Sequence, residues 1–403
     1  MKNNNIPKLR YPEFTDAWEK CKLERYLKTS TLKNTESQYS KEDVLSVSGE
    51  FGIVNQIKFK GRSFAGASVE NYSIVNTGDV VYTKSPLQNN PYGIIKANKG
   101  IAGIVSTLYA VYHPKEEADP EFIQTYFELH SRTNNYLAPL VNKGAKNDMK
   151  VSSDNALKGG VIFPTLPEQQ KIGTLFRRLD RLITLHKRKW DDVILLKKAL
   201  LQKMFPENDE RLPEIRFPEF SGDWEKCKLG DLGTIEMNKR IFKEQTSTIG
   251  EIPFYKIGTF GGKADAFISK ELFEEYKSKY PYPNKGDLLI SASGSVGKVV
   301  EYSGKDEYFQ DSNIVWFNHN GKLNNLFLKQ FYSHVQWEGL EGSTIKRLYN
   351  KTILGTQISF PSLPEQQKIG TFFRRLDRLI SHHQQQYEHY QLLKKALLQQ
   401  MFI

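Results

Sequence analysis

The segment GSVGK at residues 294–298 comes closest to a nucleotide-binding motif in this sequence. A P-loop has the pattern G-x-x-x-x-G-K-[ST], in which backbone N–H groups and the lysine hold phosphates. Ala292 stands where the first glycine is required, and Val299 follows Lys298 in place of serine or threonine. The segment therefore lacks part of the phosphate and magnesium ligand set, and no nucleotide site is predicted.

Other catalytic patterns fail on similar grounds. The tripeptide NPY at residues 90–92 resembles part of an adenine methyltransferase motif, but the second proline is missing and no glycine-rich cofactor loop follows a clear strand. A proline-directed turn is the simpler prediction. His186 and His383 have no metal-ligand spacing around them, and Cys21 and Cys227 occupy matching places in a repeat. No catalytic residue, metal site or disulfide is expected.

Polar loops follow two similar strand-like segments, GDVVYTKSP at 78–86 and GDLLISASG at 286–294. Side chains of this kind donate to phosphates and read base edges. We predict DNA contacts from these loops and from a later loop in each half of the chain: Lys84, Ser85, Gln88, Asn89, Tyr92, Lys143, Lys146 and Asn147, and Ser291, Ser293, Ser295, Lys298, Ser343, Thr344, Lys346 and Arg347. The alternative for each residue is that a loop is polar only because it is solvated.

Charge supports a polyanionic partner only in part. The 403 residues carry a formal net charge of +11, which suits nucleic acid. Residues 1–206 hold 31 Lys+Arg against 21 Asp+Glu, whereas the remainder holds 26 against 25, so the second half needs local patches. The longest apolar stretch, around residues 101–112, is too short to span a bilayer, and the first residues do not resemble a signal peptide. A cytoplasmic protein is expected.

The elements that position these loops come from an internal duplication. LRYPEFTDAWEKCKL at 9–23 is answered by IRFPEFSGDWEKCKL at 215–229, with ten of fifteen positions identical. FPTLPEQQKIGTLFRRLDRLI at 163–183 matches FPSLPEQQKIGTFFRRLDRLI at 360–380 at nineteen of twenty-one positions. LLKKALLQKMF at 195–205 recurs as LLKKALLQQMF at 392–402. The intervening segments are nearly unrelated, so two unlike domains alternate with two matched blocks.

The matched blocks predict two long helices. Thr165 with Glu168, and Ser362 with Glu365, have the spacing of a capping box, and Pro206 ends the first helix after about 39 residues. Apolar residues at three-four spacing predict a coiled-coil seam: Ile172, Leu175, Leu179, Leu182, His186, Val193, Leu196 and Leu200, repeated as Ile369, Phe372, Leu376, Leu379, His383, Tyr390, Leu393 and Leu397. If the helices pair with each other, chain order makes them antiparallel, and Ile403 should end near the start of the first domain.

The predicted domain order follows from these blocks. We expect a first domain at 1–163, a helix at 164–205, a linker at 206–214, a second domain at 215–360 and a second helix at 361–403. Strand-like runs between helical segments make both domains α+β. Basic residues early in each helix are predicted to contact a partner subunit or DNA phosphates, or to form a merely solvated face: Arg177, Arg178, Arg181, Arg374, Arg375 and Arg378.

The alternation, the WEKCKL entries, the pattern GDLLISASGSVGK and above all the two LPEQQKIG helix openings resemble the specificity subunit of type I restriction-modification enzymes, over the whole chain. The resemblance implies an α+β fold: two mixed α/β target recognition domains separated by two long antiparallel coiled-coil helices, with internal pseudo-twofold duplication. It also implies that each domain reads one half of a split, asymmetric double-stranded DNA site across a gap.

The same resemblance implies partners and places the chemistry on them. Two adenine-methylating subunits would bind S-adenosylmethionine, and restriction subunits would use ATP and Mg²⁺ to translocate and cut DNA, so this chain would hold no cofactor and catalyse nothing. The matched helices would then present two similar docking faces. Two alternatives remain: a protein–protein scaffold without DNA sequence preference, and a self-sufficient methyltransferase or nuclease.

Overall fold

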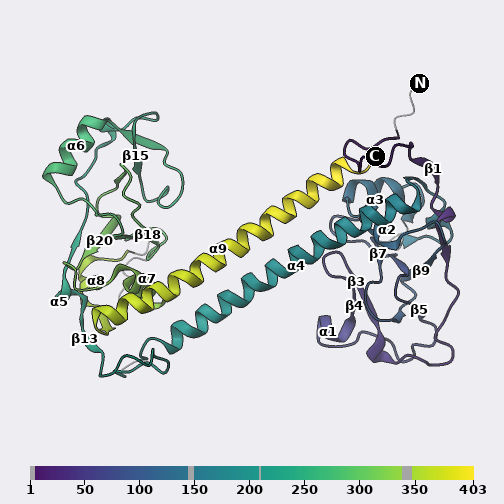
Figure 1. Cartoon of the computed structure of the whole chain (residues 1–403), viewed down its shortest axis with the longest axis horizontal. Helices are drawn as coiled ribbons and strands as arrows, with labels where there is room; N and C mark the ends of the chain where they lie inside the picture. Colours follow the sequence, from purple (N-terminus) through teal and green to yellow (C-terminus); the bar gives the residue numbers. More distant parts are fainter. Residues whose placement is uncertain (1–4, 144–148, 208–209, 338–346) are drawn as a thin grey trace. The chain divides into compact units, whose positions relative to one another are not determined.

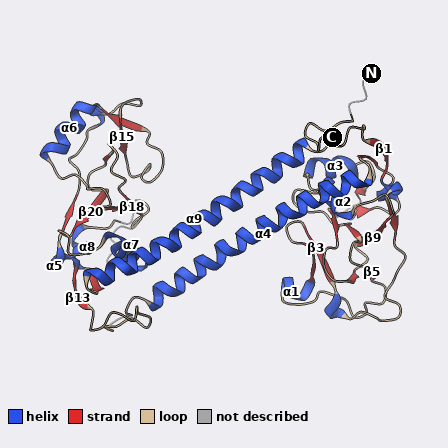
Figure 2. Ribbon diagram, in the orientation of Figure 1, coloured by secondary structure: helices blue, strands red, loops and turns tan. Residues whose placement is uncertain are grey.

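The computed structural model describes residues 5–143, 149–207, 210–337 and 347–403, which form two compact units (Figures 1 and 2). Unit 1 contains residues 1–187 and 385–403, and unit 2 contains residues 188–384. Each unit therefore holds one globular domain and one part of each of the two long helices. Among the described residues, no helix is long and apolar enough to cross a membrane.

The domain of unit 1 is built on a four-stranded antiparallel sheet with the order β2-β9-β6-β7. Its elements are β1 (Glu19–Lys22), β2 (Leu27–Thr29), β3 (Leu45–Ser48), β4 (Gly52–Asn55), α1 (Gln56–Lys60), β5 (Ser73–Val75), β6 (Val80–Thr83), β7 (Ile95–Ala97), β8 (Gly103–Val105), β9 (Tyr109–Pro114), α2 (Pro120–Tyr126), α3 (His130–Leu137), β10 (Asn142–Lys143), β11 (Met149–Lys150) and β12 (Gly160–Phe163). Strand β1 pairs with β12 where the chain enters and leaves the domain.

The domain of unit 2 contains an equivalent sheet, β14-β20-β17-β18, with the same antiparallel pairing. Its elements are β13 (Glu225–Lys228), α5 (Leu229–Leu232), β14 (Thr234–Glu236), β15 (Ile252–Tyr255), β16 (Ala266–Ile268), α6 (Lys270–Lys279), β17 (Leu288–Ser291), β18 (Val299–Glu301), β19 (Tyr308–Phe309), β20 (Ile314–Asn318), α7 (Asn325–His334), α8 (Asn350–Gly355) and β21 (Gln357–Phe360). Two segments of unrelated sequence thus share one sheet topology. The predicted α+β fold class is confirmed.

The long helices α4 (Leu166–Lys203) and α9 (Leu363–Gln400) each have 38 residues. In unit 1 the Lys394 ammonium lies 2.5 Å from the Asp180 carboxylate, and in unit 2 Lys197 lies 2.6 Å from Asp377. A second contact in each unit gives the direction: the His186 and Tyr390 rings lie 5.6 Å apart in unit 1, and the Phe205 and Phe373 rings lie 6.3 Å apart in unit 2. Within each unit, residue numbers therefore rise along one helix where they fall along the other, so the helices are antiparallel. The two ion pairs join equivalent residues of the repeat, as the internal duplication predicts.

The seam between the helices differs from the predicted one in the second half of its register. Leu196 and Leu393 are exposed, whereas Lys197 and Lys394 are partly buried at the next position. Leu379, earlier in α9, is also exposed. In a coiled coil, the residues that face the other helix recur at alternating spacings of three and four. Lys197 lies four residues after Val193 and occupies such a position, and its ammonium pairs with the Asp377 carboxylate of the other helix. The prediction that Leu196 and Leu393 face the other helix was therefore wrong.

The LPEQQKIG segments join each helix to its own domain. Glu168 is buried and accepts two hydrogen bonds of 2.7 Å from Arg10 and one of 3.3 Å from the Trp18 indole, and Glu365 accepts two of 2.7 Å from Arg216. These carboxylates therefore serve tertiary ion pairs, and the predicted capping boxes are wrong. Distant arginines outcompete the local backbone because a bidentate, charge-assisted pair is the stronger interaction.

The glutamine that follows each glutamate holds a helix of the domain. The Gln169 side chain accepts from the Asp119 amide at 3.1 Å and donates to the Pro164 carbonyl at 2.9 Å. Gln366 makes the same two contacts, with the Asn324 amide and the Pro361 carbonyl, both at 2.8 Å. One glutamine in each repeat thus fixes the start of α2 or α7 against the long helix.

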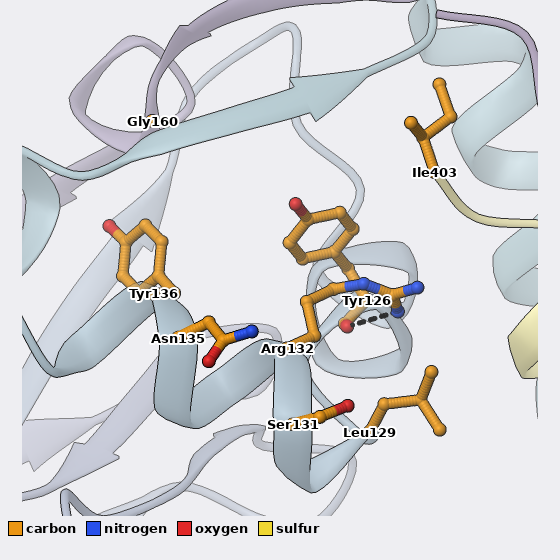
Figure 3. Close-up of a pocket in the computed structure, with 8 residues that line it drawn as sticks. All are labelled: Tyr126, Leu129, Ser131, Arg132, Asn135, Tyr136, Gly160 and Ile403. Carbon is orange, nitrogen blue, oxygen red and sulfur yellow. Dashed lines mark hydrogen bonds between the residues drawn. The ribbon is translucent and has the colours of Figure 1, made fainter.

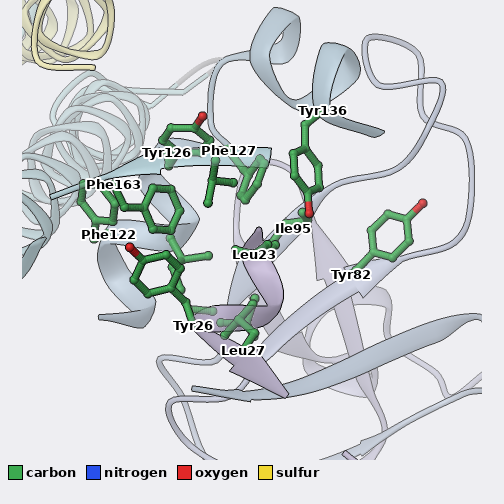
Figure 4. Packing of buried hydrophobic residues seen from close by; sticks show 14 of the residues in the cluster. Leu23, Tyr26, Leu27, Tyr82, Ile95, Phe122, Tyr126, Phe127, Tyr136 and Phe163 are labelled. Atoms are coloured by element: carbon green, nitrogen blue, oxygen red, sulfur yellow. The ribbon is translucent and has the colours of Figure 1, made fainter. Parts of the chain in front are cut away.

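Each long helix ends in the core of the domain that it does not begin in. The Leu9 amide donates to the Gln400 carbonyl at 2.9 Å, and Phe402 packs against the aromatic cluster around Phe122 and Tyr126, at ring distances of 5.5 and 6.0 Å. Figure 4 shows how this cluster, with Phe163, fills the space between α2 and the sheet. The expectation that the chain ends near the start of the first domain is confirmed.

Substitution of Gly370 with alanine tests this joint. An added Cβ would lie 2.6 Å from the Leu326 Cβ and 2.7 Å from the Phe327 backbone nitrogen, so α7 must move away from α9. We expect a loss of about 1–3 kcal/mol in the free energy of unfolding, measured by urea denaturation. Gly355→Ala is the control, because nothing lies within 4 Å of its added Cβ. Equal denaturation midpoints for the two variants would contradict the packing argument.

Candidate nucleic-acid interface

The loop after β17 in unit 2 is shaped by Ser291, one of the predicted contact residues. Its buried hydroxyl accepts from the Lys298 amide at 2.9 Å and donates to the Ser295 carbonyl. Ser291 therefore holds the two ends of the loop together, whereas Ser295 and Lys298 are exposed on it. The Lys298 ammonium donates to the Phe260 carbonyl at 2.5 Å, which keeps this cation at the edge of the sheet.

The structure brings the two predicted loops of unit 2 together. Ser293 pairs with Arg347 through a backbone bridge, and the Ser293 hydroxyl donates to the Asn313 amide oxygen at 2.8 Å. The Arg347 guanidinium donates to the Ser312 carbonyl at 3.3 Å and lies 5.7 Å from the centroid of the half-exposed Tyr349 ring. Ser343, Thr344 and Lys346 lie outside the described residues.

Ser312, Asn313 and Tyr349 belong to this surface and were missed in the sequence. Ser312 has a positive φ of 52°, an uncommon conformation for a residue with a side chain. The run Gln310-Asp311-Ser312-Asn313 before β20 is the signal that was available, because aspartate, serine and asparagine favour tight turns. Together with Ser293 and Arg347, these residues form a polar surface with one cation and one aromatic ring.

The equivalent loop in unit 1 packs on helix α3. The Asn134 side chain donates to the Asn89 carbonyl at 3.0 Å, and the Tyr82 hydroxyl donates to the Tyr92 carbonyl at 2.7 Å. The Gly93 amide donates to the Asn90 carbonyl at 3.0 Å, so the turn predicted for the NPY segment is confirmed. Only glycine fits at position 93, where φ is +91° and an added Cβ would lie 1.9 Å from the Thr83 carbonyl oxygen.

The predicted side chains of this loop differ in accessibility. Gln88 and Asn89 are exposed, and Lys84 and Ser85 are half-buried at the end of β6. Burial and the neighbouring Lys33 lower the pKa of the Lys84 ammonium, so an approaching phosphate would relieve repulsion there. Lys143 lies in β10, which pairs with β11. Lys146 and Asn147 lie outside the described residues, so their relation to this loop stays a prediction.

A pocket of about 370 Å³ in unit 1 belongs to the helix–domain joint and not to this loop. Figure 3 shows Arg132 beside Tyr126, with Ile403 among the other residues that line the pocket. The Arg132 guanidinium donates to the Tyr126 carbonyl at 2.9 Å and lies 5.0 Å from the Phe402 ring. Its place suggests that it supports the docked end of α9. In the part of the chain that the structure describes, no three histidine, cysteine, aspartate or glutamate side chains are grouped as metal ligands.

The predicted helix arginines are exposed in both units, and each row lies near exposed leucines. In unit 1, Arg177, Arg178 and Arg181 lie on the stretch of α4 that pairs, through Asp180 and Lys394, with the stretch of α9 that carries the exposed Leu392 and Leu393. In unit 2, the equivalent stretch of α9 carries Arg374, Arg375 and Arg378. The stretch of α4 that pairs with it carries Leu195 and Leu196. We call these the two arginine–leucine surfaces. They present the same residue types in the same order on the two units.

Comparison with known proteins identifies the family. Residues 221–389 match the model of the type I restriction modification DNA specificity domain. A putative type I restriction enzyme specificity subunit from Haemophilus influenzae is 36% identical over 308 residues, which cover 73% of this chain and 78% of that protein. The putative MjaX specificity subunit from Methanocaldococcus jannaschii is 22% identical over 313 residues, 70% of this chain and 67% of that protein.

A solved structure extends the likeness to the whole fold. The crystal structure of the S subunit from a type I restriction-modification system of M. genitalium aligns with a TM-score of 0.61 over 99% of both chains, at 14% identity. That likeness concerns the fold alone. The identity to the Haemophilus protein over most of both chains carries the assignment: this chain belongs to the non-catalytic DNA specificity subunits of type I restriction-modification enzymes.

Proposed function

We propose that the chain recognises a bipartite, asymmetric double-stranded DNA target, with residues 1–163 reading one half and residues 215–360 reading the other. The observation that carries this proposal is the pair of equivalent sheets with different loops. The loop after β6 and the loop after β17 leave the same place in the same topology, but one offers Gln88 and Asn89 whereas the other offers Ser293 and Arg347. Equivalent placement with different side chains suits two domains that read two different sequences.

The residue types at each loop fit direct readout of bases. Asparagine and glutamine can bond an adenine edge with two hydrogen bonds, and arginine can do the same with guanine. Lys84 and Lys298, at the ends of the same loops, would contact phosphates, which fix the register of a protein on the duplex. We therefore assign base reading to the loop tips and positioning to the lysines at their ends.

Partner subunits are the second part of the proposal. The two arginine–leucine surfaces are equivalent in the repeat, so they suit two copies of one adenine-methylating subunit, with the arginines contacting that subunit or DNA phosphates. Those subunits would bind S-adenosylmethionine and flip the target adenines out of the duplex. Restriction subunits would supply ATP- and Mg²⁺-dependent translocation and cleavage. The complex would act in the cytoplasm, with the lengths of α4 and α9 setting the number of unread base pairs.

Mapping of N6-methyladenine tests this function. The chain would be expressed with its modification subunits in a host that has no other adenine methylation, and the methylated sites sequenced. We expect one interrupted motif with two different halves. A continuous motif, or methylation that depends on the chain but shows no sequence preference, would contradict the proposal, and the second result would favour a protein scaffold.

A further inference from the structure

A second surface of unit 1 is rich in exposed aromatic rings and cations and lies outside the recognition loops. Phe51 and Phe64 are each 58% exposed and Phe59 is 36% exposed. They lie within the segment 51–64, which also carries Lys58, Lys60 and Arg62 and has no acidic residue. We call these six residues the basic aromatic patch. Single exposed apolar residues are normal, but three of them beside three cations in one short segment are not.

Two of the three cations of the patch lie over its rings, and none of the three pairs with a carboxylate among the described residues. The Lys60 ammonium is 4.6 Å from the centroid of Phe59, and the Arg62 guanidinium is 4.7 Å from the centroid of Phe64. Within the described part of the chain, no carboxylate lies in ion-pair range of Lys58, Lys60 or Arg62. The nearby Asp43 carboxylate accepts from the Ser40 amide at 2.8 Å. The positive charges of Lys58, Lys60 and Arg62 therefore remain available to an anion.

The segment is held in place by its own polar side chains. Asn55 caps α1 by accepting from the Lys58 amide at 3.1 Å, and it donates to the Glu42 carbonyl at 2.6 Å. Gln56 accepts from the Phe64 amide at 2.6 Å and donates to the Ser46 hydroxyl at 3.1 Å. The two amide side chains of the segment are thus occupied internally. The patch presents ordered cations and rings, but no free amide that could read a base edge.

These features favour one occupant over the others. Lysine is depleted from protein–protein interfaces, and a membrane surface is usually met by a longer amphipathic helix than the five residues of α1. Unpaired lysine and arginine side chains, held by aromatic contacts, suit the closely spaced phosphates of a duplex. Building on the function proposed above, we infer that the basic aromatic patch binds the sugar–phosphate backbone of the target DNA beside the half-site read by unit 1, without reading its sequence.

Neutralising the three cations tests this inference. The full chain with Lys58→Ala, Lys60→Ala and Arg62→Ala, assembled with its modification subunits, would be titrated with a duplex that carries the methylated motif and with a scrambled duplex. We expect both affinities to fall by the same factor, roughly 100-fold at 0.15 M salt, and the slope of log K against log salt to flatten by about 2.7, because three phosphate contacts are lost. The methylated motif should stay unchanged.

A matched control removes the same charge from another part of unit 1. Lys8→Ala, Lys20→Ala and Lys158→Ala alter three exposed lysines outside the patch and should leave the salt slope within about 0.5 of the wild type. Thermal unfolding of both triple variants checks that each is folded. As an independent readout, a photo-crosslinking amino acid at position 64 should couple to DNA, and the same group at position 20 should not.

The outcomes separate this inference from the function on which it rests. If the wild-type complex shows no preference for any duplex, the proposed function fails. If it binds its motif but the patch variant keeps the wild-type affinity and salt slope, only the inference is overturned. A loss confined to the motif-bearing duplex would show base reading and would also overturn it. The inference would also be overturned if the patch variant bound DNA like the wild type but lost binding to phosphatidylserine vesicles, because the patch would then be a membrane-binding surface.

Discussion

A chain in which residues 229–356 replace residues 23–159 is expected to direct methylation to an interrupted palindrome. Both domains of that chain would carry the loops of unit 2, including Ser293 and Arg347. The pairs Lys394–Asp180 and Lys197–Asp377 join equivalent residues of the two repeats, on helices that run antiparallel in each unit. Two identical domains in that relation should read two identical half-sites in opposite orientations. All sites of the parent motif should lose methylation.

The structure indicates that this exchange can fold. Strand β1 pairs with β12 in the register Glu19 to Phe163, and β13 pairs with β21 in the equivalent register Glu225 to Phe360, so both ends of the graft join matching strand pairs. Inside the graft, the N-cap Asn324 and Phe327 of α7 are equivalent to the N-cap Asp119 and Phe122 of α2. Gln169 should therefore meet the Asn324 amide as Gln366 does.

The reciprocal exchange is the matched control. Placing residues 23–159 between β13 and β21 should give an interrupted palindrome of the other half-site. Sequencing of methylated adenines reports both motifs, and together they should contain the two halves of the parent motif and nothing else. If either exchange altered both halves, or left the parent motif in place, the two domains would not be independent reading modules.

How much of this fold the sequence could predict depends on the range of the interactions. The two long helices follow from local signals, because the proline at the helix start and the three-four spacing act within a few residues. The shared sheet topology was not visible, because strand pairs such as β6 with β9 join distant residues whose identities differ between the repeats. A sequence pattern can therefore predict that a segment forms a strand, but not which other strand it pairs with.

The local errors have the same origin. Glu168 has the spacing of a capping residue, but only the fold reveals that Arg10 reaches it. Leu196 and Lys197 both continue a helical pattern from Val193, and the partner helix selects Lys197 through Asp377. Both predictions failed where a distant charge decides between two local possibilities. For the candidate site, the strand-loop pattern located the loop of Ser293, whereas its contact with Asn313 required the sheet.

The double substitution Leu195→Gln and Leu196→Gln is expected to remove one partner subunit from the complex. These side chains are 65% and 50% exposed, so the free energy of unfolding should change by less than about 0.5 kcal/mol. Burying a leucine at an interface contributes about 1.5–3 kcal/mol, so the pair should weaken docking roughly a hundredfold or more. If the wild type holds two modification subunits, as proposed above, the complex should then hold one, as measured by mass photometry.

The repeat supplies the control for this prediction. Leu392→Gln with Leu393→Gln removes the equivalent surface of unit 1 and should also leave one subunit bound, whereas all four substitutions should leave none. Ile249→Gln, which alters an 88% exposed residue outside the helices, should leave both subunits in place. Two bound subunits in either double variant would show that the exposed leucines do not form the docking surfaces. Loss of both subunits from one double variant would mean that docking at the two surfaces is coupled, since equivalent and independent sites must lose their occupants one at a time.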